Sequence, residues 1–125
     1  MIKILVVDDE LDVEDLFRQR FRKEVRENDF HFNFAHSAEE ALTFLSTLNP
    51  FDIVLILSDI NMPGMSGLQL LKIVKEKYPL LKIVMVTAYG DTNNFETAQS
   101  AGADDFVTKP VDFPALKERI RTLTV

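Results

Sequence analysis

The sequence predicts a doubly wound α/β fold, in which helices cover both faces of a five-stranded parallel sheet. Short apolar runs, typical of strands buried on both faces, take turns with segments whose apolar residues recur every three or four positions, as in amphipathic helices. This alternation repeats five times. The length of 125 residues suits one domain, over residues 1–125, and is too short for two.

The first strand is predicted at Ile2–Val7, an apolar run that suits a central parallel strand. The apolar residues from Val13 to Val25 then follow helical spacing and predict a single first helix. Phe30–Phe34 alternates phenylalanine with polar residues, which predicts a second strand with one wetter face at an edge of the sheet.

The second helix is predicted to begin at Ser37, because Glu40 follows three residues later and completes the pattern of a capping box. It should end near Asn49-Pro50, since proline disfavours helix in the residue before it. Ile53–Leu57 is the next apolar run and predicts a third strand, whose end is marked by Asp59.

The rest of the chain repeats the same pattern. The predicted elements are a turn at Asn61–Gly67, a helix with Leu68, Leu71, Val74 and Tyr78 on one face, a strand at Lys82–Thr87, a helix at Thr92–Ala101, a strand at Asp105–Thr108 and a helix capped by Asp112. Phe95 is the only bulky apolar residue of the helix at 92–101. We therefore expect this helix to be weakly anchored.

Composition and charge exclude several classes of protein. Hydrophobic residues make up 46% and charged residues 27%, as in folded globular chains, and the longest apolar run is far too short to cross a membrane. Cysteine is absent, which excludes disulfides and thiolate chemistry and agrees with the reducing cytoplasm, where we expect the protein. A net charge of −6 opposes direct nucleic-acid binding, and the basic cluster from Arg18 to Arg26 is interpreted as a solvated helix face.

Chemically active side chains follow the predicted strands. They are Asp8 and Asp9 after the first strand, Asp59 at the end of the third, Thr87 at the end of the fourth and Lys109 after the fifth. Ligands of open α/β sheets bind outside the carboxyl ends of the strands, so we expect these side chains to converge. Each alone has an ordinary explanation, because aspartate caps helices, threonine suits strands and lysine suits surfaces. Their joint position carries the prediction.

The same residues predict a magnesium site and a nucleophile. Three aspartates in one crevice raise the cost of ionising one another unless a cation lies between them. Oxygen donors favour a hard ion, and few carboxylates with room for water and phosphate oxygens favour Mg²⁺ over Ca²⁺. Asp59 is the candidate nucleophile, because a carboxylate can form an acyl phosphate, and Lys109 and Thr87 could stabilise the transferred group. His31 and His36 are interpreted as surface residues beside the second strand.

Four segments together resemble the receiver domains of two-component response regulators, of which the chemotaxis-type single-domain receiver is the familiar example. The segments are Ile4–Glu10, Ser58–Gly67, Val86–Ala88 and Ala101–Pro110, and they occur in the order typical of that family. The resemblance covers the entire chain. It implies a flavodoxin-like sheet with strand order 2-1-3-4-5.

The resemblance also implies how the site would work. Asp59 would accept a phosphoryl group from the phosphohistidine of a sensor histidine kinase or a histidine phosphotransfer protein. Asp9, Asp59 and the backbone carbonyl of Asn61 would bind Mg²⁺, and Asp8 would hold the waters of the metal. Lys109 would pair with the phosphate. The chain would be a phosphoacceptor that assists its own phosphorylation and autodephosphorylation, and not an enzyme acting on other substrates.

A switch and an output surface are implied in the same way. Thr87 would move its hydroxyl toward the phosphate and Phe106 would turn inward. The fourth helix, fifth strand and fifth helix would then regulate a downstream protein or a covalently attached output domain, and a phosphorylation-dependent homodimer is compatible with this surface. Lys109-Pro110 would be a cis peptide.

Three features depart from the commonest pattern of that family or qualify the comparison. Asp52 lies seven residues before Asp59, where such receivers often show five, and an even insertion preserves which side chains face inward. Phe106 lacks the hydroxyl of the tyrosine often found at this position. Asn61 and Tyr89 occupy positions that resemble those tuning dephosphorylation.

Three other functions remain open at this point. An electron carrier of the flavodoxin type shares the topology, but its flavin phosphate would meet the acidic loop at 8–12. An aspartate-nucleophile phosphatase would need a second aspartate as acid, and Asp59-Ile60-Asn61 lacks one. A degenerate receiver that serves only as a docking module is opposed by the intact set of site residues.

Overall fold

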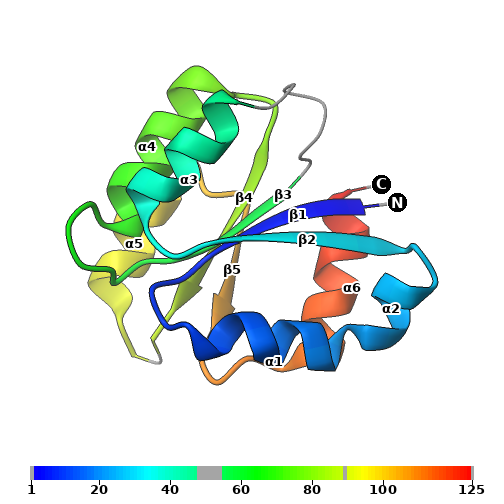
Figure 1. Cartoon of the computed structure of the whole chain (residues 1–125). Coiled ribbons are helices and arrows are strands. Elements are labelled where there is room, and N and C mark those ends of the chain that lie inside the picture. Colours follow the sequence, from blue (N-terminus) through cyan, green and yellow to red (C-terminus); the bar gives the residue numbers. More distant parts are fainter. Residues whose placement is uncertain (1, 48–54, 89, 125) are drawn as a thin grey trace.

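The structure is a computed structural model that describes residues 2–47, 55–88 and 90–124, and it shows a five-stranded parallel sheet between two layers of helices (Figure 1). The strands are β1 (Ile2–Val7), β2 (Phe30–Ala35), β3 (Leu55–Asp59), β4 (Lys82–Thr87) and β5 (Asp105–Thr108). The helices are α1 (Asp12–Arg20), α2 (Arg22–Arg26), α3 (Ala38–Ser46), α4 (Gly67–Lys77), α5 (Thr92–Ser100) and α6 (Phe113–Leu123). The strands lie in the order β2-β1-β3-β4-β5, which confirms the predicted doubly wound fold.

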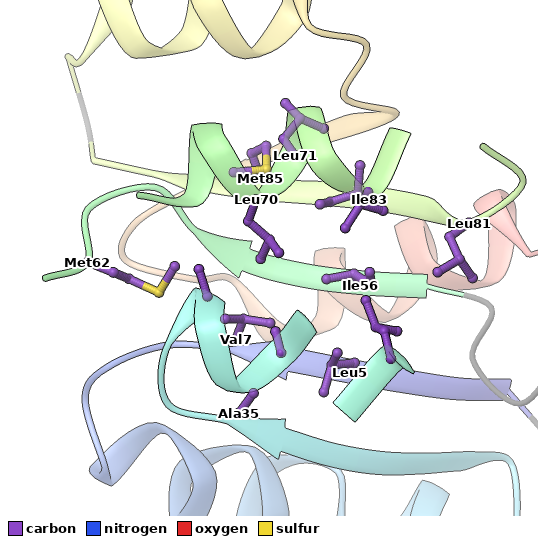
Figure 2. Close-up of a cluster of buried hydrophobic side chains, with 14 of the residues drawn as sticks. Leu5, Val7, Ala35, Ile56, Met62, Leu70, Leu71, Leu81, Ile83 and Met85 are labelled. Atoms are coloured by element: carbon purple, nitrogen blue, oxygen red, sulfur yellow. The ribbon is translucent and has the colours of Figure 1, made fainter. Parts of the chain in front are cut away.

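Alternating side chains of the central strands divide the core into two clusters. Leu5 and Val7 of β1 point toward α3, α4 and α5, and Figure 2 shows them beside Ile56 and the leucines of α4. Ile4 and Val6 point to the opposite face, which α1 and α6 cover. The continuous apolar runs of the sequence are therefore explained by burial on both faces of the sheet.

Phenylalanine rings fill the second cluster and interrupt the first helix. Phe21 is fully buried, with its ring centroid 4.9–5.9 Å from those of Phe17, Phe30, Phe32 and Phe113. Such pairs each contribute about 0.5–1.5 kcal/mol beyond the burial of their area. These contacts hold Phe21 in the core, and the backbone leaves helical geometry at this residue (φ −108°, ψ 18°).

The single first helix predicted from Val13 to Val25 is therefore wrong. α1 ends at Arg20 and α2 begins at Arg22, with Phe21 between them outside both helices. Leu16 and Val25, which belong to the predicted apolar pattern, are 39% and 40% exposed.

Most other elements lie where the sequence predicts them. β4 and β5 coincide with the predicted strands, and Ala98 is the only buried residue of α5, which confirms the weak anchoring of that helix. Lys109-Pro110 is cis. The predicted helix stop at Asn49-Pro50, the start of the strand at Ile53–Leu57, and Asp52 and Tyr89 lie outside the described residues.

Helix caps also follow the sequence, with one change of partner. Ser37 accepts a hydrogen bond from the Glu40 N–H at 3.0 Å, and Asp112 accepts one from the Ala115 N–H at 3.2 Å. The Glu40 carboxylate, however, accepts from the N–H of His36 rather than from that of Ser37. Within the described part of the chain, no helix is long and apolar enough to cross a membrane.

Candidate functional site

Three carboxylates meet at the carboxyl ends of β1 and β3. Val7 and Ser58 are register partners, so Asp8 and Asp59 leave neighbouring strands side by side. Asp8, Asp9 and Asp59 each offer one carboxylate oxygen within 4.8 Å of the other two. Asp8 is 8% exposed and Asp59 is 6% exposed, whereas Asp9 is half-buried. The predicted convergence of these aspartates is thus observed.

Helix capping does not explain these aspartates. The N-cap of α1 is Leu11, which makes no side-chain cap, and Asp8 Oδ1 instead accepts the Glu10 N–H at 2.9 Å. The N-terminus of α4, the helix that follows Asp59, is capped by Ser66 in a reciprocal capping box with Gln69. The acidic cluster is therefore free for another role.

Lys109 supplies the cation of the site in this structure. Its Nζ lies 3.0 Å from Asp59 Oδ2, and its backbone N–H donates to the carbonyl of Thr87 at 2.8 Å, which joins the end of β5 to the end of β4. Burial by itself lowers the pKa of the Lys109 ammonium, but the hydrogen bond and the charge of Asp59 outweigh burial and raise it above its ordinary value. Lys109 is therefore protonated at neutral pH.

For the carboxyl of Asp8, in contrast to Lys109, the effect of burial on the pKa outweighs the effects of its neighbours. Burial raises the pKa of its carboxyl above the ordinary value; the hydrogen bond from the Glu10 N–H opposes this rise and the charge of Asp59 adds to it. One lysine does not neutralise three close carboxylates, so a second cation would relieve their repulsion. All donors are oxygens, which fits Mg²⁺ and excludes sites for soft metals.

The remaining predicted residues lie around this cluster. Asp59 is the register partner of Val86, so Thr87 is the next residue along β4; it is buried at 5% exposure. Asn61 is exposed and directs its N–H to Asp59 Oδ1 at 3.4 Å. Phe106 lies on β5, and its ring is 4.3 Å from that of Phe95 on α5. The metal-binding role of the Asn61 carbonyl stays a prediction.

Two residues that position the loop after Asp59 were missed in the sequence. Gly67 packs so closely on the end of β3 that a Cβ would overlap the Asp59 carbonyl oxygen. Glu39 of α3 accepts the Met65 N–H at 2.9 Å and thereby anchors the loop from the side. A glycine at the start of a helix, where it adds no propensity, could have suggested close backbone approach, but the sequence does not show which backbone it approaches.

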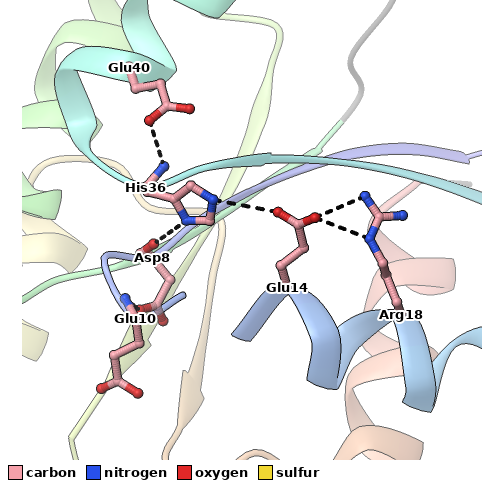
Figure 3. Close-up of polar contacts among 6 residues, drawn as sticks. All are labelled: Asp8, Glu10, Glu14, Arg18, His36 and Glu40. Carbon is pink, nitrogen blue, oxygen red and sulfur yellow. Dashed lines mark hydrogen bonds and ion pairs between the residues drawn. The ribbon is translucent and has the colours of Figure 1, made fainter. Parts of the chain in front are cut away.

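The ring of His36 contacts two other residues and does not lie freely on the surface. Figure 3 shows its ring between β1 and α1: Nδ1 lies 3.4 Å from the Asp8 carbonyl oxygen and Nε2 lies 3.5 Å from Glu14 Oε1. Glu14 also pairs with Arg18 at 3.2 Å. The side chain of His36 is 31% exposed, so its assignment to the surface is only partly right, whereas His31 is exposed as predicted.

An apolar cavity of about 550 Å³ opens directly onto the site. Asp59 and Lys109 form part of its lining. The rest comes mainly from α1, including Leu16, and from the residues that lead from β5 into the first turn of α6, including Phe113 and Pro114. A reacting group that reaches Asp59 from this side would lie against apolar side chains.

Fold and site together define a doubly wound α/β protein with an acidic, lysine-paired crevice at the carboxyl ends of its strands. The chain belongs to the response regulator receiver domain family, which it matches over residues 4–121. This confirms the family resemblance drawn from its four sequence segments.

Individual relatives agree with this assignment. The chain is 37% identical over 123 residues to the response regulator protein PilR of Pseudomonas aeruginosa, with 96% of this chain and 25% of PilR covered. It is 32% identical over 121 residues to the chemotaxis protein CheY-3 of Vibrio cholerae, with 95% and 88% covered. A receiver domain crystal structure from Clostridium thermocellum superposes with a TM-score of 0.88 at 27% identity and covers 99% of this chain and 94% of that one. The chain thus spans about a quarter of the length of PilR.

Proposed function

We propose that this domain is a phosphoacceptor of two-component signalling, which takes a phosphoryl group on Asp59 in a Mg²⁺-dependent reaction. The observation that carries the proposal is the geometry of Asp59, a buried carboxylate that lies within 4.8 Å of two others and 3.0 Å from the Lys109 ammonium. A carboxylate at this point can attack phosphorus, and the groups around it can hold the added charge.

In the proposed reaction, an Asp59 oxygen forms a bond to phosphorus while the bond from phosphorus to the donor nitrogen of a phosphohistidine breaks. The donor imidazole keeps the electron pair of the broken bond. Asp8, Asp9, Asp59 and the Asn61 carbonyl would hold Mg²⁺, which when bound neutralises phosphoryl oxygens. Lys109 would transfer its ammonium contact from the carboxylate to the phosphoryl group, and the Thr87 hydroxyl would donate to it.

The partner that supplies the phosphoryl group would be a sensor histidine kinase or a histidine phosphotransfer protein. The apolar cavity between α1 and the start of α6 supports this proposal, because it leads to Asp59 and offers Leu16 and Phe113 to an apolar surface. Binding there would bring the phosphohistidine to Asp59 and exclude water from the reaction.

We also propose that α5, β5 and α6 form the output surface, with Thr87 and Phe106 as the switch. α5 is held by a single buried residue, Ala98, so a small change at Thr87 can shift it at low cost. Because PilR is about four times as long as this chain, an attached output domain is proposed as the target alongside a separate protein.

The experiment is incubation of the protein with acetyl phosphate, with and without Mg²⁺, followed by intact-mass analysis of wild type and Asp59→Asn. A Mg²⁺-dependent gain of one phosphate in wild type alone is expected. A gain of phosphate in Asp59→Asn would show that Asp59 is not the acceptor. No gain in either protein, even with a phosphorylated histidine kinase, would favour a docking module without phosphotransfer.

A further inference from the structure

A basic groove lies beside β2, away from the acidic site. It encloses about 320 Å³, and its lining is formed by Arg18, Arg22, Val25, Arg26, His31 and Phe32. Arg18 lies on α1 and Arg22 and Arg26 lie on α2, so two successive helices bring three positive charges to one groove beside β2. Figure 1 shows α1 and α2 running along β2, the outermost strand on that side.

The positive charge of this groove is largely unneutralised. Arg18 pairs with Glu14 and lies over the ring of Phe34 at 5.0 Å. Among residues 2–47, 55–88 and 90–124, neither Arg22 nor Arg26 has a carboxylate within ion-pair distance. The protein as a whole carries a net charge of −6, so this patch is opposite in sign to the rest of the molecule.

Two further features suit the groove to an extended chain. Among the strands that the structure describes, β2 pairs with β1 alone, which leaves its outer backbone groups open to another strand. Val25 is 40% exposed and provides an apolar contact between the arginines. An added strand would present alternate side chains to one face, so acidic and apolar residues could reach their partners in turn.

We propose that this groove binds an acidic extended segment of a partner protein, which pairs with the open edge of β2. Carboxylates of the segment contact Arg22 and Arg26, and an apolar side chain covers Val25. A nucleic acid fits less well, because it has no peptide N–H and C=O groups to pair with the open edge of β2. The proposal does not depend on phosphorylation of Asp59.

The test is a titration of the whole ¹⁵N-labelled protein with a synthetic peptide of alternating Glu and Val, at low salt. Amide shift changes are expected in residues 18–35, together with a binding constant that falls as salt is added. The double variant Arg22→Gln/Arg26→Gln should weaken binding about three- to tenfold, the loss expected for two exposed ion pairs. The matched double variant Lys72→Gln/Lys77→Gln on α4, and Asp59→Asn, should bind as wild type does.

A peptide in which every Glu is replaced by Gln keeps the test independent of how the variants fold, and it should bind at least threefold more weakly. Shift changes absent from β2, or equal weakening by the α4 variant, would overturn the proposal. Tighter binding of a single-stranded oligonucleotide than of the Glu-Val peptide would overturn the assignment to a protein segment. Failure here leaves phosphorylation of Asp59 untouched, because the acetyl phosphate experiment reads that out separately.

Discussion

Substitution of Gly67 by alanine is expected to damage both the fold and the acceptor. Gly67 is the first residue of α4, and its N–H donates to the Ile60 carbonyl at 2.8 Å. An added Cβ would overlap the Asp59 carbonyl oxygen and would lie 2.8 Å from Ile60 Cα and 2.9 Å from the Asp59 carbonyl carbon. All three are backbone atoms, so no side-chain rotation relieves the overlap. Either α4 or the end of β3 has to move.

Two opposing effects set the size of the loss. Alanine is favoured over glycine by about 1 kcal/mol in a helix interior, which is an upper limit for Gly67 at the first position of α4. Overpacking of a close contact costs about 1–3 kcal/mol, and the upper end applies because the backbone itself must shift. We therefore expect Gly67→Ala to lose about 2 kcal/mol of unfolding free energy. Displacement of Asp59 by about 1 Å would in addition slow phosphorylation on the order of 100-fold.

The assays are urea unfolding followed by circular dichroism, and the rate of mass gain with acetyl phosphate and Mg²⁺. Gly102→Ala is the control, because Gly102 has a positive φ of 95° but its Cβ would meet only Lys75 Cγ at 3.9 Å. This control should lose about 1–2 kcal/mol from backbone strain alone and phosphorylate normally. Wild-type stability and phosphorylation in Gly67→Ala would refute the reasoning from close backbone contact.

Three further predictions concern charge. Because folding raises the pKa of Asp8, the ionised carboxylate opposes folding and wild type loses stability as pH rises through that pKa. Asp8→Asn should thus unfold at higher urea than wild type at neutral pH without Mg²⁺, and equal midpoints would contradict this. Mg²⁺ at ten times its dissociation constant should stabilise wild type by about 1.4 kcal/mol, an increment that Asp9→Asn should lack in the same urea assay. Lys117→Met leaves the buried Glu24 without its ion partner at 3.1 Å and should cost about 3 kcal/mol, the low end for a buried pair because the Lys117 side chain is 28% exposed, whereas Lys117→Arg should cost less. Burial by itself raises the pKa of Glu24, but the Lys117 contact lowers it overall, so this stabilisation is present above the ordinary pKa and disappears as pH falls through the lowered one. If Lys117→Met loses as much stability as wild type does when the pH falls through the pKa of Glu24, this stabilising role of Lys117 is refuted.

Much of the fold is predictable because it depends on local patterns. Burial on both faces requires continuous apolar strands such as Ile2–Val7, and parallel pairing brings the residues after each strand to one edge. The convergence of Asp8, Asp59 and Lys109 follows from that rule alone. The roles of Asn61 and Phe106 came from the family resemblance, and they stay predictions.

The missed features depend on tertiary contacts that no local pattern encodes. The apolar spacing of Val13–Val25 continues helically through Phe21, while the break arises from the rings that surround it in the folded core. The sequence predicts Gly67 only as a turn residue, and its close contact with the end of β3 is seen only in the structure. Glu39 stabilises the Met65 amide 26 residues away, a separation that no helix or turn pattern spans.

The most direct test of the central claim is to locate the phosphoryl group. The protein is incubated with acetyl phosphate and Mg²⁺ and reduced with borohydride, which converts an aspartyl phosphate to homoserine, and its peptides are then analysed by mass spectrometry. We predict homoserine at position 59, dependent on Mg²⁺ and absent from Asp59→Asn. Homoserine at position 8 or 9 instead, or unaltered labelling of the Asp59→Asn protein, would contradict the assignment of Asp59 as the phosphoacceptor.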